Sequence, residues 1–168
     1  MATSLSSCVV DTNILIDLHR GGVLREFFQL PCTIFAPDVI VAELLDPSGE
    51  MLLVLGLRRM DFSGAEVVRV IDISRNHPEV SINDLFAVLL AETKGALLLT
   101  GDKRLRRIAE QEHHLQVHGT LWVLDQLVKR KHLSPTEASS ALQKMIQSGS
   151  RLPRAECERR FQKWSGLA

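Results

Sequence analysis

Hydrophobic residues recur along this chain with two alternating patterns. Short apolar runs that are typical of buried parallel strands lie at residues 8–10, 32–35, 96–99 and 115–117. Segments in which apolar residues repeat every three or four positions, as on one face of a helix, follow each of them. Strands that alternate with helices predict a three-layer α/β/α fold around a central parallel sheet.

Helix signals divide the rest of the chain. Ser134 and Glu137 form a capping box with Pro135 at the first helical position, and this predicts extra C-terminal helices beyond the sheet. The apolar run at 51–55 is compatible with either a helix or a strand. The other predicted helices lie at 12–20, 23–28, 37–44, 64–75, 81–92, 103–110 and 120–130.

Two apolar groups give specific packing predictions. In the predicted helix at 64–75, Val67, Val68 and Ile71 are expected to face the core. In the basic C-terminal tail, Phe161 and Trp164 lie three residues apart and could form a docking edge. Both predictions depend on spacing alone.

Composition sets the scale of the protein. With 168 residues, 45% of them hydrophobic, the chain suits a main domain at 1–133 with a helical extension at 134–168. Twenty basic and twenty acidic residues cancel, so only local clusters could attract a polyanion. The first residues lack the pattern of an export signal, and no apolar run approaches the length of a membrane span. We therefore expect a cytoplasmic protein with no membrane partner.

Two acidic residues follow predicted strands closely. Asp11 comes directly after the run at 8–10, and Asp102 comes after the run at 96–99 with Thr100 and Gly101 between them. Ligands of open α/β sheets bind outside the carboxyl ends of the strands, so both carboxylates are well placed for chemistry. Each could instead cap the helix that starts there.

Two further acidic residues lie in predicted helices. Glu43 is three or four residues from Val39 and Ile40, which places it on the inward stripe of its helix, although its head could lie in water at the rim. Asp84 lies three residues after Ser81, so it could act in helix capping and still direct an oxygen toward the sheet edge.

A group of carboxylates at one edge requires a counter-charge. Two of them roughly 4 Å apart repel by about 4 kcal/mol at an effective dielectric constant near 20. Oxygen ligands without neighbouring His or Cys suit Mg²⁺ or Mn²⁺. Asn13 and Thr100 add neutral oxygens, and neither strand end has a Ser or Cys nucleophile paired with a base. This pattern favours attack of a metal-activated water on a phosphodiester.

The same residues carry a family resemblance. Val9 to Asn13, Glu43 in Val-Ala-Glu-Leu-Leu, Asp84 in Ile-Asn-Asp, and Leu99 to Asp102 resemble, in order, the four acidic motifs of the PIN-domain nucleases. His118 to Leu121 resembles a feature of the prokaryotic, VapC-like branch of that family.

The resemblance implies an Mg²⁺- or Mn²⁺-dependent endoribonuclease. Asp11, Glu43, Asp84 and Asp102 would be the catalytic carboxylates, with Asp11, Asp84 and Asp102 on the metal and Asn13 and Thr100 in support. It also implies a homodimer and, as an option, the toxin of a toxin–antitoxin pair with a small antitoxin as partner.

Basic residues could bind the RNA substrate. Lys103, Arg104 and Arg107 follow Asp102 directly, and a phosphate backbone passing the acidic site would require such charges. Runs of charge more often mark a solvated helix face. The alternative to an enzyme is a catalytically silent PIN-like module that binds RNA or protein.

Overall fold

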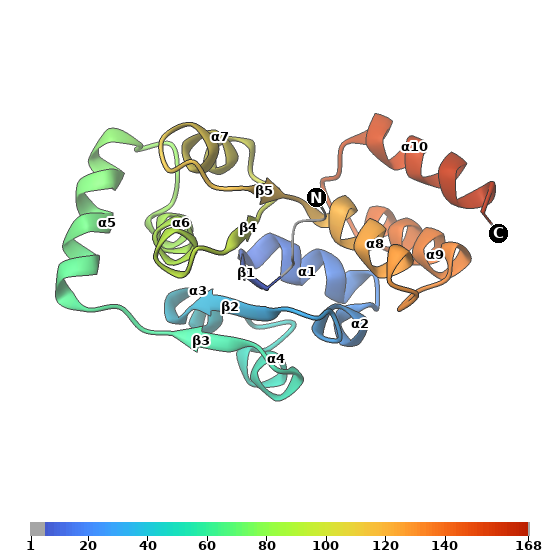
Figure 1. The fold of residues 1–168 in the computed structure, drawn as a ribbon, viewed down its shortest axis with the longest axis horizontal. Coiled ribbons are helices and arrows are strands. Elements are labelled where there is room, and N and C mark those ends of the chain that lie inside the picture. Colours follow the sequence, from blue (N-terminus) through green and yellow to red (C-terminus); the bar gives the residue numbers. More distant parts are fainter. Residues whose placement is uncertain (1–5, 168) are drawn as a thin grey trace.

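The computed structural model describes residues 6–167, which form a five-stranded parallel sheet between helices (Figure 1). The strand order is β3-β2-β1-β4-β5, and every neighbouring pair is parallel. The predicted three-layer α/β/α fold is therefore confirmed. The strands are β1 (Ser7–Val10), β2 (Thr33–Pro37), β3 (Arg58–Met60), β4 (Leu97–Leu99) and β5 (Val117–His118).

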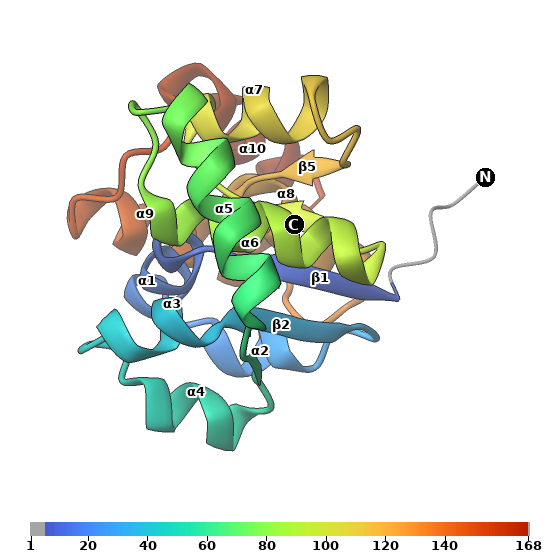
Figure 2. The same cartoon turned by 90° about the vertical axis from the view of Figure 1, so that its left-hand side faces the viewer.

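Helices cover both faces of the sheet. Helices α5, α6 and α7 lie on one side, and α1, α2, α8 and α9 lie on the other (Figure 1). Figure 2 shows α5 as the outermost helix, in front of α6. The helices are α1 (Thr12–Arg20), α2 (Leu24–Phe28), α3 (Asp38–Glu43), α4 (Gly49–Leu55), α5 (Gly64–Asn76), α6 (Ile82–Lys94), α7 (Lys103–Gln111), α8 (Thr120–Lys129), α9 (Pro135–Gln147) and α10 (Arg154–Ser165).

The core is organised around β1, the middle strand. Cys8, Val9 and Val10 are all buried, because β1 has a strand on each side and helices on both faces. Helix α6 contacts β1, β2 and β4, and its residues 85–91 are all buried. Continuous apolar runs, rather than alternating ones, are what such doubly covered elements require. The sheet and α6 were predictable for this reason.

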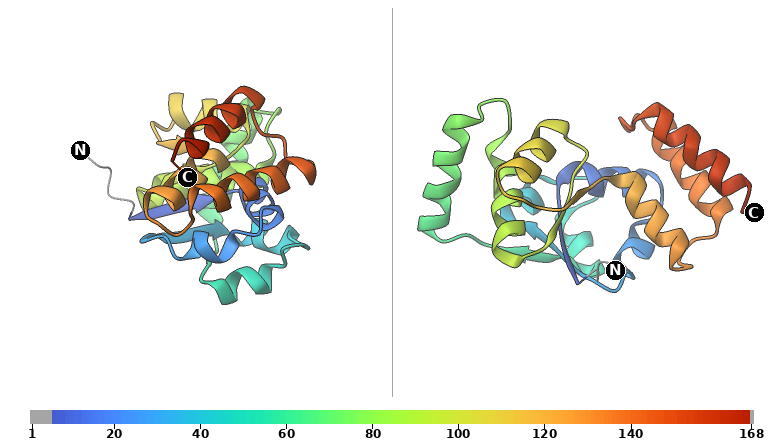
Figure 3. Two further views of the ribbon diagram at one scale, coloured as in Figure 1. Left: turned by 90° about the vertical axis from the view of Figure 1, so that its right-hand side faces the viewer. Right: turned by 45° about the horizontal axis from the view of Figure 1, so that its top comes forward.

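The C-terminal helices pack on the domain and do not project from it. Figure 3 shows α9 and α10 together at one end of the molecule, in orange and red. Trp164 is only 1% exposed, and Phe161 packs against the same core. The predicted docking edge at these two residues is therefore wrong, since both face the interior. The guanidinium group of Arg160 also binds the carboxylate of Asp125 on α8, at 3.0 Å.

The structure corrects two further sequence predictions and settles an ambiguous one. The edge strand β3 was missed, because its sequence Arg-Arg-Met lacks an apolar run. The ambiguous run at 51–55 is helical and belongs to α4. On α5 the buried residue is Val70, whereas Val68 is 58% exposed, because this helix contacts α6 through one narrow face.

None of the helices in the described part of the chain is long and apolar enough to cross a lipid bilayer.

Candidate active site

The site lies where the order of the strands reverses. From β1 the chain adds β2 and β3 on one side of the sheet, and later adds β4 and β5 on the other. Such a switch point leaves a crevice outside the carboxyl ends of the two central strands. Asp11 directly follows β1, and Asp102 follows its neighbour β4 by three residues. Both predicted residues therefore lie at this crevice.

Asp11 is a buried carboxylate at the start of α1. It is 1% exposed, and one oxygen accepts a hydrogen bond from the backbone N–H of Ile14 at 3.0 Å. The other oxygen accepts one from the hydroxyl of Thr100. Burial raises the pKa of Asp11 to about 7, against the lowering effect of these two bonds, and the charges of Asp84 and Asp17 raise it further.

Thr100 connects Asp11 to Asp102. Its hydroxyl donates to Asp11 and accepts from the backbone N–H of Asp102 at 3.0 Å. The Oδ1 atom of Asp102 accepts from the backbone N–H groups of Arg104 and Leu105, at 2.7 and 3.1 Å, so Asp102 caps α7. Within residues 6–167 its Oδ2 atom makes no hydrogen bond and can accept another ligand.

Asp84 lies near the other acidic groups. The Ser81 side chain caps α6, and its hydroxyl donates to Asp84 at 2.6 Å, as the capping alternative predicted. Asp84 is half-buried, and burial raises its pKa, with further raising by the charges of Asp102 and Glu43. The two alternatives are thus compatible. Asp84 takes part in the cap of α6, and it also lies close enough to Asp102 and Glu43 for their charges to raise its pKa.

Of the two positions that the sequence left open for Glu43, the structure bears out the one at the rim. Glu43 is exposed, so the inward-facing alternative is wrong. Helix α3 ends at this residue, and the carboxylate extends from the helix end to the side chains of two other segments. It accepts hydrogen bonds from the hydroxyl of Thr12 at 2.5 Å and from the amide of Asn83 at 2.9 Å. These bonds hold Glu43 beside the starts of α1 and α6.

The four carboxylates fit a hard divalent cation in chemistry and in charge. All are oxygen donors, the charges of Asp102 and Glu43 raise the pKa of Asp84, and the charge of Asp84 raises the pKa of Asp11. Within residues 6–167, no three Asp, Glu, His or Cys side chains already form a ready metal-binding group. Several of their oxygens are instead held by Ser81, Thr12 and Asn83. A cation bound by Asp84 would therefore compete with the Ser81 hydroxyl for one of its two oxygens.

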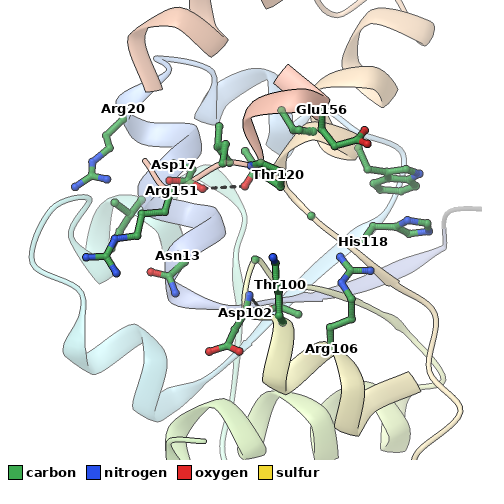
Figure 4. A pocket seen from close by; sticks show the side chains of 18 of the residues that line it. Asn13, Asp17, Arg20, Thr100, Asp102, Arg106, His118, Thr120, Arg151 and Glu156 are labelled. Atoms are coloured by element: carbon green, nitrogen blue, oxygen red, sulfur yellow. Dashed lines mark hydrogen bonds between the residues drawn. The ribbon is translucent and has the colours of Figure 1, made fainter. Parts of the chain in front are cut away.

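A cleft of about 1120 Å³ opens beside the carboxylates (Figure 4). It meets the acidic group through Asn13, Thr100 and Asp102, whereas the other three carboxylates do not line it. The exposed Asn13 is thus placed between the carboxylates and the cleft. This arrangement suits a supporting role for Asn13.

Asp17 is an acidic residue in this cleft that the sequence motifs did not indicate. Asp17 is nearly buried and accepts a hydrogen bond from the hydroxyl of Thr120 at 2.9 Å, which joins α1 to α8. Helical spacing could have revealed it, since Asn13, Asp17 and Arg20 lie four and three residues apart, on the cleft-lining side of α1.

The predicted substrate-binding residues separate into two groups. Lys103 and Arg104 line the cleft, whereas Arg107 pairs with Glu79 at 3.3 Å and does not line it. The cleft also contains Arg20 and Arg151, which no sequence cluster indicated. Arg151 comes from the segment before α10, so only the fold brings it to the site.

This parallel sheet, with acidic residues at its switch point and helices on both faces, defines a nuclease-like α/β/α domain. The chain belongs to the PIN-domain family: a family model named DUF3368, whose description is PIN domain, matches residues 7–166. The resemblance inferred from the four motifs is thereby confirmed at the level of the family, and the VapC-like branch stays a prediction. No curated protein matches the chain.

Proposed function

We propose that this protein is a metal-dependent endoribonuclease that hydrolyses phosphodiester bonds at the crevice between β1 and β4. The observation that carries the proposal is the meeting of Asp11, Asp84 and Asp102, from three separate helix starts, at the switch point of the sheet. Such a concentration of negative charge at one crevice is unfavourable, even though Asp11 and Asp102 also cap helices, and a bound cation would relieve it.

The residues divide the work as follows. Asp11, Asp84 and Asp102 would hold Mg²⁺ or Mn²⁺, and the bound ion would supply an activated water and neutralise charge on the phosphate. Thr100 fixes the carboxylate of Asp11 through its hydroxyl. Glu43, the exposed member of the group, would accept a proton from the attacking water.

Asn13 acts at the border between the carboxylates and the cleft. Its amide can donate a hydrogen bond to a phosphate oxygen while the strand lies in the cleft. Because Asn13 is neutral, it can do so without adding to the negative charge of the site.

The test is Mn²⁺-dependent cleavage of a mixed pool of single-stranded RNA. Wild type is compared with Asp84→Asn and Asp102→Asn, and both substitutions should reduce the rate at least about a hundredfold. The matched control is Asp72→Asn, because Asp72 is an exposed carboxylate on the far helix α5. This control should cleave like wild type.

Two outcomes would contradict the proposal. Equal cleavage by all four proteins would show that the activity is a contaminant or that the site lies elsewhere. RNA binding without cleavage by wild type, in both Mg²⁺ and Mn²⁺, would favour the silent binding module.

The toxin role, the antitoxin partner and the homodimer are proposals that depend on the family resemblance. Growth arrest on expression of wild type, but not of Asp102→Asn, would support the toxin role. Sedimentation of the purified chain would test the dimer.

A further inference from the structure

The cleft beside the carboxylates carries an excess of positive charge. Six cationic side chains line it against three carboxylates, although the chain as a whole is neutral. The six cations are Arg20, Lys103, Arg104, Arg106, Arg151 and Arg160. Charge of one sign that gathers in a concave wall attracts an anionic partner.

Most of these cations have no acidic partner. Within residues 6–167, Arg20, Lys103, Arg104 and Arg151 form no ion pair with a carboxylate. The carboxylate of Asp17 instead accepts from Thr120, and that of Glu156 pairs with Arg160 and Arg159. Arg20 donates to the hydroxyl of Ser150 at 3.5 Å and Arg104 to the backbone carbonyl of Glu79 at 3.3 Å, but both partners are neutral, so the positive charge stays available to an anionic ligand.

The cations lie on both sides of the cleft. Figure 4 shows Arg20 and Arg151 on one side of the cleft and Arg106 on the other, with Asn13 and Asp102 between them. A polyanion that lies against both sides would pass Asp102. The acidic group would then contact the backbone of that polyanion at one point.

A stacked aromatic pair completes the cleft. The rings of His118, at the end of β5, and Trp122, in the first turns of α8, lie parallel, with centroids 4.2 Å apart and 6° between their planes. Both side chains are partly exposed and line the cleft. Burial and the nearby charge of Arg106 lower the pKa of His118, so its ring is neutral at neutral pH. A flat aromatic surface in a cleft that also contains the guanidinium groups of Arg20, Arg104 and Arg151 suits a base and its phosphates.

We propose that this cleft binds a single-stranded stretch of RNA, with an unpaired base stacked on the His118–Trp122 pair and adjacent phosphates on Arg20, Arg104 and Arg151. The inference rests on the proposed function, because it supplies the substrate path for the same site. An unpaired strand is favoured over a duplex because a base can reach an aromatic ring only when it is free of its own stack and partner.

The experiment measures binding without cleavage. A fluorescein-labelled oligouridylate is titrated in EDTA, and anisotropy gives Kd for wild type, Trp122→Ala, Arg151→Gln and the control Arg107→Gln. Trp122→Ala should weaken binding about tenfold, and the salt dependence for Arg151→Gln should fall by about 0.7 in the slope of log K against log salt. Arg107→Gln should match wild type, because Arg107 lies outside the cleft and pairs with Glu79.

Intrinsic fluorescence gives a second readout that does not depend on a destabilising variant. The chain has two tryptophans, and Trp164 is buried, so only Trp122 can stack on a base. RNA should quench the emission of wild type, and the quenching should disappear in Trp122→Phe. An oligonucleotide of the same length with abasic sites should bind without quenching.

The outcomes separate this inference from the proposed function. Cleavage with Mn²⁺ combined with unchanged binding in Trp122→Ala and no quenching would overturn the base-stacking role and leave the nuclease intact. Trp122-dependent binding without cleavage would support the cleft and overturn the nuclease. A perfect RNA duplex that binds more tightly than the single strand, or an acidic peptide that binds equally well without quenching, would also overturn the inference.

Discussion

Burial of the Asp11 carboxyl predicts an unusual dependence of stability on pH in the metal-free protein. Its pKa is raised from 3.8 to about 7 in the folded state, chiefly by burial. The folded protein therefore binds a proton between these values that the unfolded chain does not. The stabilisation is fully present below pH 3.8 and is lost as the pH rises through 7.

The magnitude follows from the size of the shift. Each pH unit below 7 adds about 1.4 kcal/mol to the free energy of unfolding, so this group contributes about 2.5 kcal/mol between pH 8 and pH 5. Asp11→Asn removes the titration and keeps an oxygen that can accept from Ile14. In EDTA the variant should be more stable than wild type at pH 8 and lose that advantage by pH 5.

The assay is urea unfolding followed by circular dichroism at several pH values in EDTA. Only the difference between wild type and Asp11→Asn is interpreted, because other titrating groups cancel in it. Mg²⁺ added at pH 8 should stabilise wild type and leave the variant unchanged. The exposed control Asp72→Asn should run parallel to wild type. Parallel curves for wild type and Asp11→Asn would refute the reasoning, since they would mean that the Asp11 carboxyl is solvated in the folded state.

Three further predictions concern individual side chains. Asp102→Asn should abolish cleavage with little change in the urea midpoint of unfolding. Asp102→Ala should also lower the free energy of unfolding by about 1 kcal/mol, because the α7 cap is lost. Equal stability of the two variants would contradict the capping role. Trp164→Ala should destabilise the protein by about 3–5 kcal/mol, measured by urea unfolding, because the side chain is fully buried; a cost under about 1 kcal/mol would show that α10 is detached in solution. Ser134→Ala should lower the free energy of unfolding by about 1 kcal/mol, because the α9 capping box is lost. The control is Ser140→Ala in the same helix, and equal effects of the two substitutions would exclude a capping contribution.

The sequence predicted the parts of the fold in which burial leaves a continuous pattern. The runs at β1 and β4 and the long apolar stretch of α6 were readable because both sides of these elements are covered. Strand β3 was not readable, because its two arginines face solvent at the sheet edge. Trp164 was misread because the spacing of residues in a helix does not reveal which neighbour covers them.

The candidate site was predictable to a similar degree. Asp11 and Asp102 could be placed because each follows a strand, and strand ends of a parallel sheet share one edge. The sequence left both an inward and an exposed position open for Glu43, because the choice depends on α3 ending at that residue. The sequence predicted neither the position of Arg151 in the cleft nor the stacking of His118 on Trp122. Both depend on how separate segments pack together in the fold.

The two central carboxylates also stabilise the helix N-termini at which they lie. Asp11 starts α1 and Asp102 starts α7, and asparagine supports a helix start about as well as aspartate does. A single such exchange at either position would silence the chemistry while the architecture survives. A lineage that inherits this scaffold could thus lose the proposed chemistry in one mutational step and keep a folded domain with its cleft.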